Sequence, residues 1–139
     1  MNRIVWLDDF VLGIDMIDGH HKQLVALINL VAECLGNNAA PSQLASVLGG
    51  LKDYATYHFN AEEEFMKKIG YPDCAAHGRL HHKFSDHITG LGIRFEEGDS
   101  TVLEELAAYL EFWLIDHIVV NDSLYASFAG SLDERHVMV

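Results

Sequence analysis

Four side chains of the types that bind metals lie in two pairs near the middle of the chain. His58 and Glu62 are four residues apart, and so are His77 and His81. Residues at positions i and i+4 share one face of a helix, so each pair would direct two potential ligands the same way. A turn marked by Gly70 separates the pairs. The spacing predicts two neighbouring antiparallel helices that contribute to one metal site.

The rest of the sequence has the periodicity of a helical bundle that could hold such a site. The chain has 139 residues, half of them hydrophobic, which fits a single domain over 1–139 with an apolar core. Apolar residues recur at helical spacing. We expect an all-α, up-down-up-down four-helix bundle with an ordered arm before it, a capping box at 101–104, and a short helical segment after it. The expected bounds are 1–15 for the arm, 16–36, 41–69, 73–97 and 101–120 for the helices, and 122–128 for the last segment.

Polar residues interrupt the apolar stripes of all four helices at one level of the bundle. His21 lies near the start of the first helix and His117 near the end of the fourth. In an up-down bundle these positions meet the two central pairs at the same end. A single histidine on an apolar stripe is more often a hydrogen-bonded core residue, but an unpaired buried polar group costs several kcal/mol, about 2–7. Six such residues at one level therefore favour a metal site.

The other polar residues have plainer interpretations. Glu63 and Glu64 are expected on a solvated face, with support of a ligand as a lesser possibility for them. Cys34 and Cys74 fall at opposite ends of the bundle and should remain reduced thiols without a disulfide. The remaining histidines lie off the stripes or in the tail and are expected at the surface: His20, His82, His87 and His136.

Charge and hydropathy limit the partners and the location. The formal net charge of −12 disfavours nucleic acid, because phosphate backbones are repelled. No stretch of about 18 apolar residues occurs, and the first residues lack a signal-like apolar segment, so neither membrane insertion nor export is expected. A cytoplasmic location is the expectation.

These motifs together resemble the hemerythrin family in its single-domain bacterial form. The resemblance rests on the segment GIDMIDGHHKQL at 13–24, the His58-Phe59 pair before Glu62, His77-x3-His81, the segment WLIDH at 113–117, and Asp122. It implies a four-helix bundle with two non-haem iron ions joined by an oxo or hydroxo bridge.

The resemblance also assigns the ligands. It implies three histidines on one iron and two on the other, so the second iron keeps an open position. Asp122 lies five residues after His117, about 140° around an ideal helix. We therefore expect the fourth helix to end, tighten or distort between Val119 and Asp122. The implied sets are His77, His81 and His117 for the first iron, His21 and His58 for the second, and Glu62 and Asp122 as bridges.

An apolar pocket beside the open position would suit dioxygen. The resemblance implies reversible dioxygen binding for carriage, storage or delivery, with the molecule held as a hydroperoxide on the five-coordinate iron, and it implies a protein that is not an enzyme. An apolar pocket lining admits a small neutral molecule and offers no hydrogen-bonding groups that would bind a larger polar one. The implied lining residues are Leu24, Phe59, Trp113, Leu114, Ile118 and Tyr125.

Other functions remain open from the sequence. A sensor of oxygen or redox state would have to act through an unknown protein partner. Iron storage, iron detoxification, weak oxidase or peroxidase chemistry, and a zinc-binding bundle are further alternatives. A ferritin-like oxidase is disfavoured, because its Glu-x-x-His motif does not occur in the chain.

Overall fold

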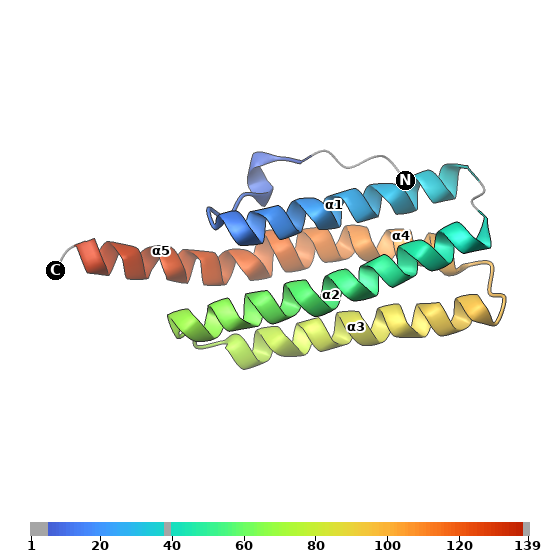
Figure 1. Ribbon diagram of the computed structural model, residues 1–139. Helices are drawn as coiled ribbons and strands as arrows, with labels where there is room; N and C mark the ends of the chain where they lie inside the picture. Colours follow the sequence, from blue (N-terminus) through green and yellow to red (C-terminus); the bar gives the residue numbers. More distant parts are fainter. Residues whose placement is uncertain (1–5, 38–39, 138–139) are drawn as a thin grey trace.

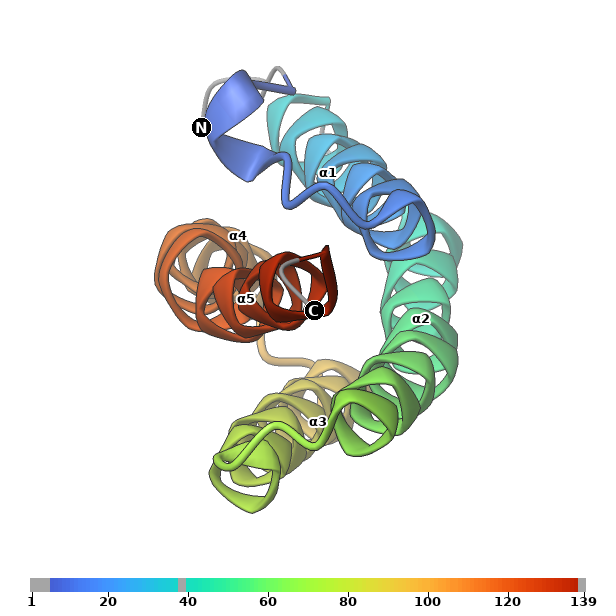
Figure 2. The ribbon, with the colours of Figure 1, turned by 90° about the vertical axis from the view of Figure 1, so that its left-hand side faces the viewer.

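Four long helices run up and down to form a bundle, as predicted. The computed structural model describes residues 6–37 and 40–137, and in these residues there is no strand. Each helix packs against two neighbours, with α1 beside α2 and α4, and α3 beside α2 and α4 (Figures 1 and 2). The elements are η1 (Asp8–Phe10), α1 (Asp15–Gly36), α2 (Pro41–Ile69), α3 (Cys74–Glu96), α4 (Val102–Trp113), η2 (Leu114–Asp122) and α5 (Ser123–Val137).

Local sequence signals place the helix ends close to the predicted positions. Pro41 occupies the first turn of α2, where its missing N–H is not needed. Gly70 ends the helix with φ of 70°, a left-handed conformation that favours glycine. The predicted capping box at 101–104 is wrong, because the Thr101 side chain caps nothing. Asp99 instead accepts the Thr101 N–H at 2.8 Å and is held by Arg94 of α3 at 2.9 Å.

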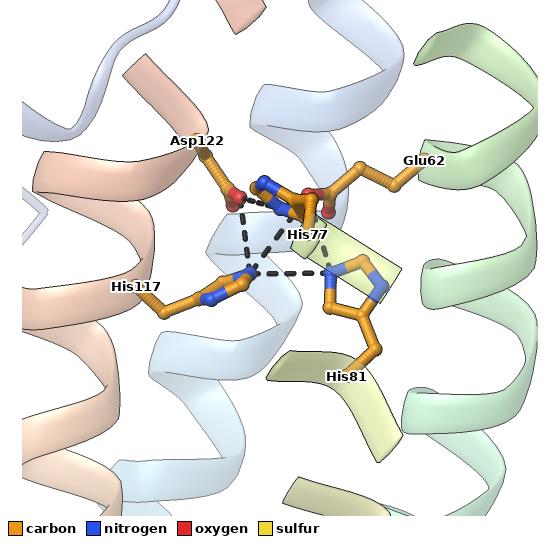
Figure 3. Close-up of side chains that lie close together, drawn as sticks. All are labelled: Glu62, His77, His81, His117 and Asp122. Carbon is orange, nitrogen blue, oxygen red and sulfur yellow. Dashed lines mark hydrogen bonds and ion pairs between the residues drawn. The ribbon is translucent and has the colours of Figure 1, made fainter. Parts of the chain in front are cut away.

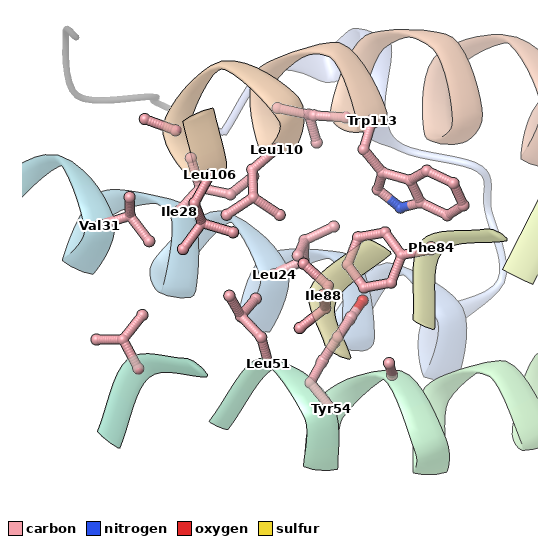
Figure 4. Close-up of a cluster of buried hydrophobic side chains, with 14 of the residues drawn as sticks. Leu24, Ile28, Val31, Leu51, Tyr54, Phe84, Ile88, Leu106, Leu110 and Trp113 are labelled. Carbon is pink, nitrogen blue, oxygen red and sulfur yellow. The ribbon is translucent and has the colours of Figure 1, made fainter. Parts of the chain in front are cut away.

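Two apolar clusters fill the bundle. The larger one takes residues from all four helices, including Leu51, Phe84 and Leu110 (Figure 4). The smaller one joins α1, α2 and α5 and has three buried members, which are Ile17, Met66 and Tyr125.

The arm is ordered and packed on the bundle over its described residues. Phe10 is buried in the larger cluster and Trp6 packs edge-on against it, with ring centroids 5.4 Å apart. Asp18 of α1 accepts the N–H groups of Leu12 and Gly13 at 2.8 and 3.1 Å, which fastens the arm to the first turn of α1.

The fourth helix departs from the expectation in kind and in length. It does distort before Asp122, but by widening into the π-helical turn η2, and the widening begins at Leu114 rather than Val119. The expected C-terminal helical segment is present, but its expected length, 122–128, is too short, because α5 continues to Val137 and extends past the other helices (Figure 1). The sequence from Ser123 to Val137 contains no proline that would stop a helix.

Two further expectations concern membranes and thiols. Among the residues described, no helix is both long and apolar enough to span a bilayer. Cys34 and Cys74 are free and lie near opposite ends of the bundle, as predicted.

Candidate metal centre

Seven buried polar side chains meet near one end of the bundle. They are the six that the sequence pattern predicts and Asp122, which the family resemblance adds. Each is at most 5% exposed, and together they come from α1, α2, α3 and η2. The residues are His21, His58, Glu62, His77, His81, His117 and Asp122.

The larger of two overlapping groups combines three histidines with both carboxylates (Figure 3). His77 Nε2 lies 2.9 Å from Glu62 Oε1 and 2.8 Å from Asp122 Oδ1. The Nε2 atoms of His81 and His117 face each other at 3.2 Å. All five ligand atoms of this group lie within 4.8 Å of one another, which is compact enough to hold a metal ion.

The smaller group combines two histidines with the same carboxylates. His21 Nε2 lies 3.0 Å from Asp122 Oδ2, and His58 Nε2 lies 2.6 Å from Glu62 Oε2. Each carboxylate thus presents one oxygen to each group. Three histidines on one side and two on the other make the arrangement asymmetric.

Several fully enclosed polar atoms of this cluster have close ion-pair contacts at most, and among the described residues no hydrogen bond of regular geometry satisfies them. They include both ring nitrogens of His21, both oxygens of Asp122 and Oε2 of Glu62. Buried polar atoms are nearly always paired, so this many orphans in one place requires an explanation. Imidazole and carboxylate groups directed at two common points are a donor set that suits iron or zinc. The residues therefore fit a pair of metal ions.

The charges of the cluster favour ionised carboxylates. Burial opposes ionisation of Glu62, but hydrogen bonds from His58 and His77 outweigh it and hold its pKa well below the usual range. The pKa of Asp122 is also lowered: burial and the charge of Glu62 oppose ionisation, and His117 and His21 prevail. Both carboxylates can therefore serve as anionic ligands.

Asp122 reaches the cluster because of the π turn. In an α-helix the fifth residue after His117 would point about 140° away from it. In η2 the backbone closes with i→i+5 geometry, which brings residues five apart onto one face. His117 Nε2 and Asp122 Oδ1 accordingly lie 3.0 Å apart.

Comparison with known proteins shows which family has this arrangement of helices. The profile of the hemerythrin HHE cation binding domain matches residues 12–129. The chain belongs to the hemerythrin family. It is 38% identical over 128 residues to a bacteriohemerythrin of Stenotrophomonas maltophilia, with 91% of this chain and 81% of the relative covered. A bacteriohemerythrin of Clostridium acetobutylicum is 30% identical, with 87% and 97% covered.

A solved structure agrees with this result. The crystal structure of a wild-type hemerythrin superposes with a TM-score of 0.82 at 28% identity, and 91% of this chain and 97% of that chain are covered. The resemblance inferred from the motifs is therefore confirmed.

Aromatic rings pack against two of the candidate ligands from the apolar side. Phe59 stacks on His81 with centroids 3.9 Å apart, and Trp113 stacks on His117 at the same distance. The six residues expected to line a dioxygen pocket are all buried, and Tyr125 differs from the other five because it belongs to the smaller cluster. Its ring lies 5.6 Å from that of His77.

Residues outside the seven also contact the candidate ligands, and the sequence pattern gives them little weight. Nδ1 of His20 lies 2.9 Å from Nδ1 of His58. Glu63 Oε2 lies 3.5 Å from His81 Nδ1, in space left free by Gly78, where a Cβ would be 2.9 Å from Glu63 Oε1. Such outer contacts orient metal ligands.

The expectation that four histidines lie at the surface is only partly correct. His82 is exposed. His20 is half-buried between Tyr57 and His58, and His87 is half-buried against Tyr109 with centroids 4.0 Å apart. Each is turned far enough from its helix stripe to meet a neighbouring helix rather than water. The side chain of His136 lies outside the described residues.

Proposed function

We propose that this member of the hemerythrin family binds dioxygen reversibly at two iron ions. His77, His81 and His117 would hold one ion, His21 and His58 the other, and Glu62 and Asp122 would bridge them. The family and the two overlapping ligand groups support a metal-dependent, oxygen-binding role. Iron as the metal and the seven residues as its ligands belong to the proposal.

The unequal share of histidines is the observation that carries the proposal. The group with His21 and His58 has one nitrogen ligand fewer than the other, while both share the same two carboxylates. A metal there would keep a free coordination position. A site meant only for structure would be closed on both metals.

The protein's own groups suit reversible binding rather than onward chemistry. When bound, an iron pair supplies two electrons that dioxygen can take and return, one from each ion. Phe59 and Trp113 stack on ligand imidazoles, and Leu24 and Ile118 add buried apolar surface. This wall excludes water and gives a larger polar substrate few polar contacts. We therefore propose a carrier rather than an enzyme.

Partners and location are further parts of the proposal. The formal charge of −12 disfavours nucleic acid. A cytoplasmic location and delivery of oxygen to a protein recipient follow the expectation from the sequence. A sensor would differ only in what it contacts, so a change of oligomeric or binding state on oxygenation would favour that alternative.

Metal analysis combined with optical spectroscopy tests the proposal. Two irons per chain and a visible band that bleaches under reductant and argon and returns with air would support it. Glu62→Ala should abolish two-iron loading, while Glu64→Ala, an exposed neighbour, should retain it. A colourless protein that retains only zinc would refute the proposal, and multiple turnover of a reductant would favour an enzyme. Vibrational spectra of the oxygenated form would test the expected hydroperoxide.

A further inference from the structure

Tyr54 places an unused hydroxyl beside the two-histidine side of the site. The residue lies on α2, one turn before His58, and is 4% exposed. Its ring stacks on the His58 ring, with centroids 5.0 Å apart and an angle of 17° between the planes. This stacking places the Tyr54 ring beside one member of the two-histidine group.

The hydroxyl has no hydrogen-bond partner among the residues that the structure describes. The oxygen of Tyr54 is fully enclosed and makes no hydrogen bond. Figure 4 shows the side chain extending from α2 into the interior, with its oxygen at the inner end. The surroundings are the larger apolar cluster. A buried donor without an acceptor is unfavourable, and in native proteins such a group often has a functional reason.

A small ligand at the free position would supply the missing acceptor. His58 belongs to the smaller ligand group, which is the one with the free position in the proposed function. A neutral phenol has one proton to donate and stays neutral at ordinary pH. Among the six residues expected to line the pocket only Tyr125 carries a hydroxyl, and its ring lies beside His77 of the larger group. Tyr54 instead stacks on His58 of the smaller group.

We propose that the Tyr54 hydroxyl donates a hydrogen bond to the small ligand held at the two-histidine metal. This inference rests on the proposed function for the location of the free position. It adds a specific donor to a pocket that is expected to be almost entirely apolar. The chemical class of ligand is a small molecule or anion with a terminal acceptor atom, such as reduced dioxygen or azide.

Tyr54→Phe isolates the hydroxyl from the ring. The ring itself must remain, because Tyr54 also lines a surface groove between α1 and α2 together with Leu27, Leu30 and Gly50. A smaller residue would open the interior to that groove and change several properties at once. Tyr109→Phe is the matched control: it removes a phenol hydroxyl from a half-buried tyrosine on α4 that packs on His87.

The experiment measures ligand retention in the iron-loaded full chain. For Tyr54→Phe we expect oxygen dissociation, followed by stopped flow against an oxygen scavenger, to become about tenfold faster. Azide affinity of the oxidised protein should fall by a similar factor, and the infrared stretch of bound azide should shift. Tyr109→Phe should match the unmodified protein in all three measurements. Equal values for Tyr54→Phe and Tyr109→Phe would overturn the inference.

Two further readouts separate the possible failures. If the protein does not bind oxygen reversibly but azide binding still depends on Tyr54, the proposed function fails and the hydrogen bond stands. If Tyr54→Phe does not load iron, the azide band of the unmodified protein can be compared in H₂O and D₂O. A shift in D₂O supports a donor at the ligand, and no shift refutes it.

In the metal-free protein, Tyr54→Phe should be no less stable to urea than the unmodified chain. A clear loss of stability would show that the hydroxyl stabilises the folded state instead of binding the ligand.

Discussion

The metal-free protein should lose stability as the pH rises from neutral to mildly alkaline values, because of His77. Burial disfavours its charged form, but the hydrogen bonds that it donates to Asp122 and Glu62 prevail and raise its pKa from the ordinary 6.5 to about 9. A folded-state pKa above the unfolded value means that the stabilisation is complete below pH 6.5. It is lost as the pH rises through about 9. Glu62 and Asp122, whose pKa values are lowered, stay ionised throughout this window.

The size of this effect follows from the pKa difference. Each pKa unit corresponds to about 1.36 kcal/mol, so the rise of His77 from 6.5 to about 9 is worth about 3 kcal/mol. A metal ion requires the unprotonated imidazole and therefore competes with this proton. Metal affinity should rise with pH over the window in which the metal-free protein loses stability.

Urea unfolding of chelator-treated protein at pH 6.5 and at about pH 9 measures the loss. The free energy of unfolding should fall by about 3 kcal/mol in the unmodified chain and in His82→Gln, whose side chain is exposed. The fall should be absent in His77→Gln. If His77→Gln loses as much stability as His82→Gln, the charge of His77 does not hold the metal-free site together.

Three further predictions test the surroundings of the site. Gly78→Ala should push Glu63 away from His81 and weaken metal binding about tenfold. Competition with a chelator measures this affinity, and an unchanged value would mean that the contact between Glu63 and His81 does not support the site. Leu24→Ala should cost about 2–5 kcal/mol in urea unfolding because the side chain is 1% exposed, and a loss below about 1 kcal/mol would mean that the core closes over the gap. Asp18→Ala should cost about 1–2 kcal/mol by removing the acceptor of two N–H groups in the arm, and faster proteolysis of the arm would report its release.

Sequence alone predicts most of the bundle and six of the seven polar residues at the site. The pairs His58 with Glu62 and His77 with His81 share helix faces through i,i+4 spacing, which depends only on helix geometry. His21 and His117 join them because alternate helices of an up-down bundle bring their starts and ends to one level. The helical periodicity extends over many residues, so an error in one predicted helix boundary does not change which residues share a face.

Features set by local irregularity or by neighbouring helices could not be predicted from the pattern. Ideal helix geometry places Asp122 away from the site, so only the family resemblance predicts it as a ligand. The π-helical turn η2 explains how it reaches the site. His20 lies off its stripe, so its contact with His58 depends on how closely α1 approaches α2. Tyr54 lies on the apolar stripe of α2, and such a stripe does not reveal whether a buried hydroxyl has a partner.

The π turn connects the fold to the proposed chemistry. If α4 continued as an α-helix, Asp122 would turn away and Glu62 would be the single carboxylate between the two histidine groups. The metals would then share one bridge, and the two-histidine side would lose its only acid besides Glu62. Widening the helix costs regular hydrogen-bond geometry over nine residues. In the proposed centre, metal binding would offset this cost because it would involve both His117 and Asp122. The irregular segment is therefore the part of the fold whose stability should depend most on the metal.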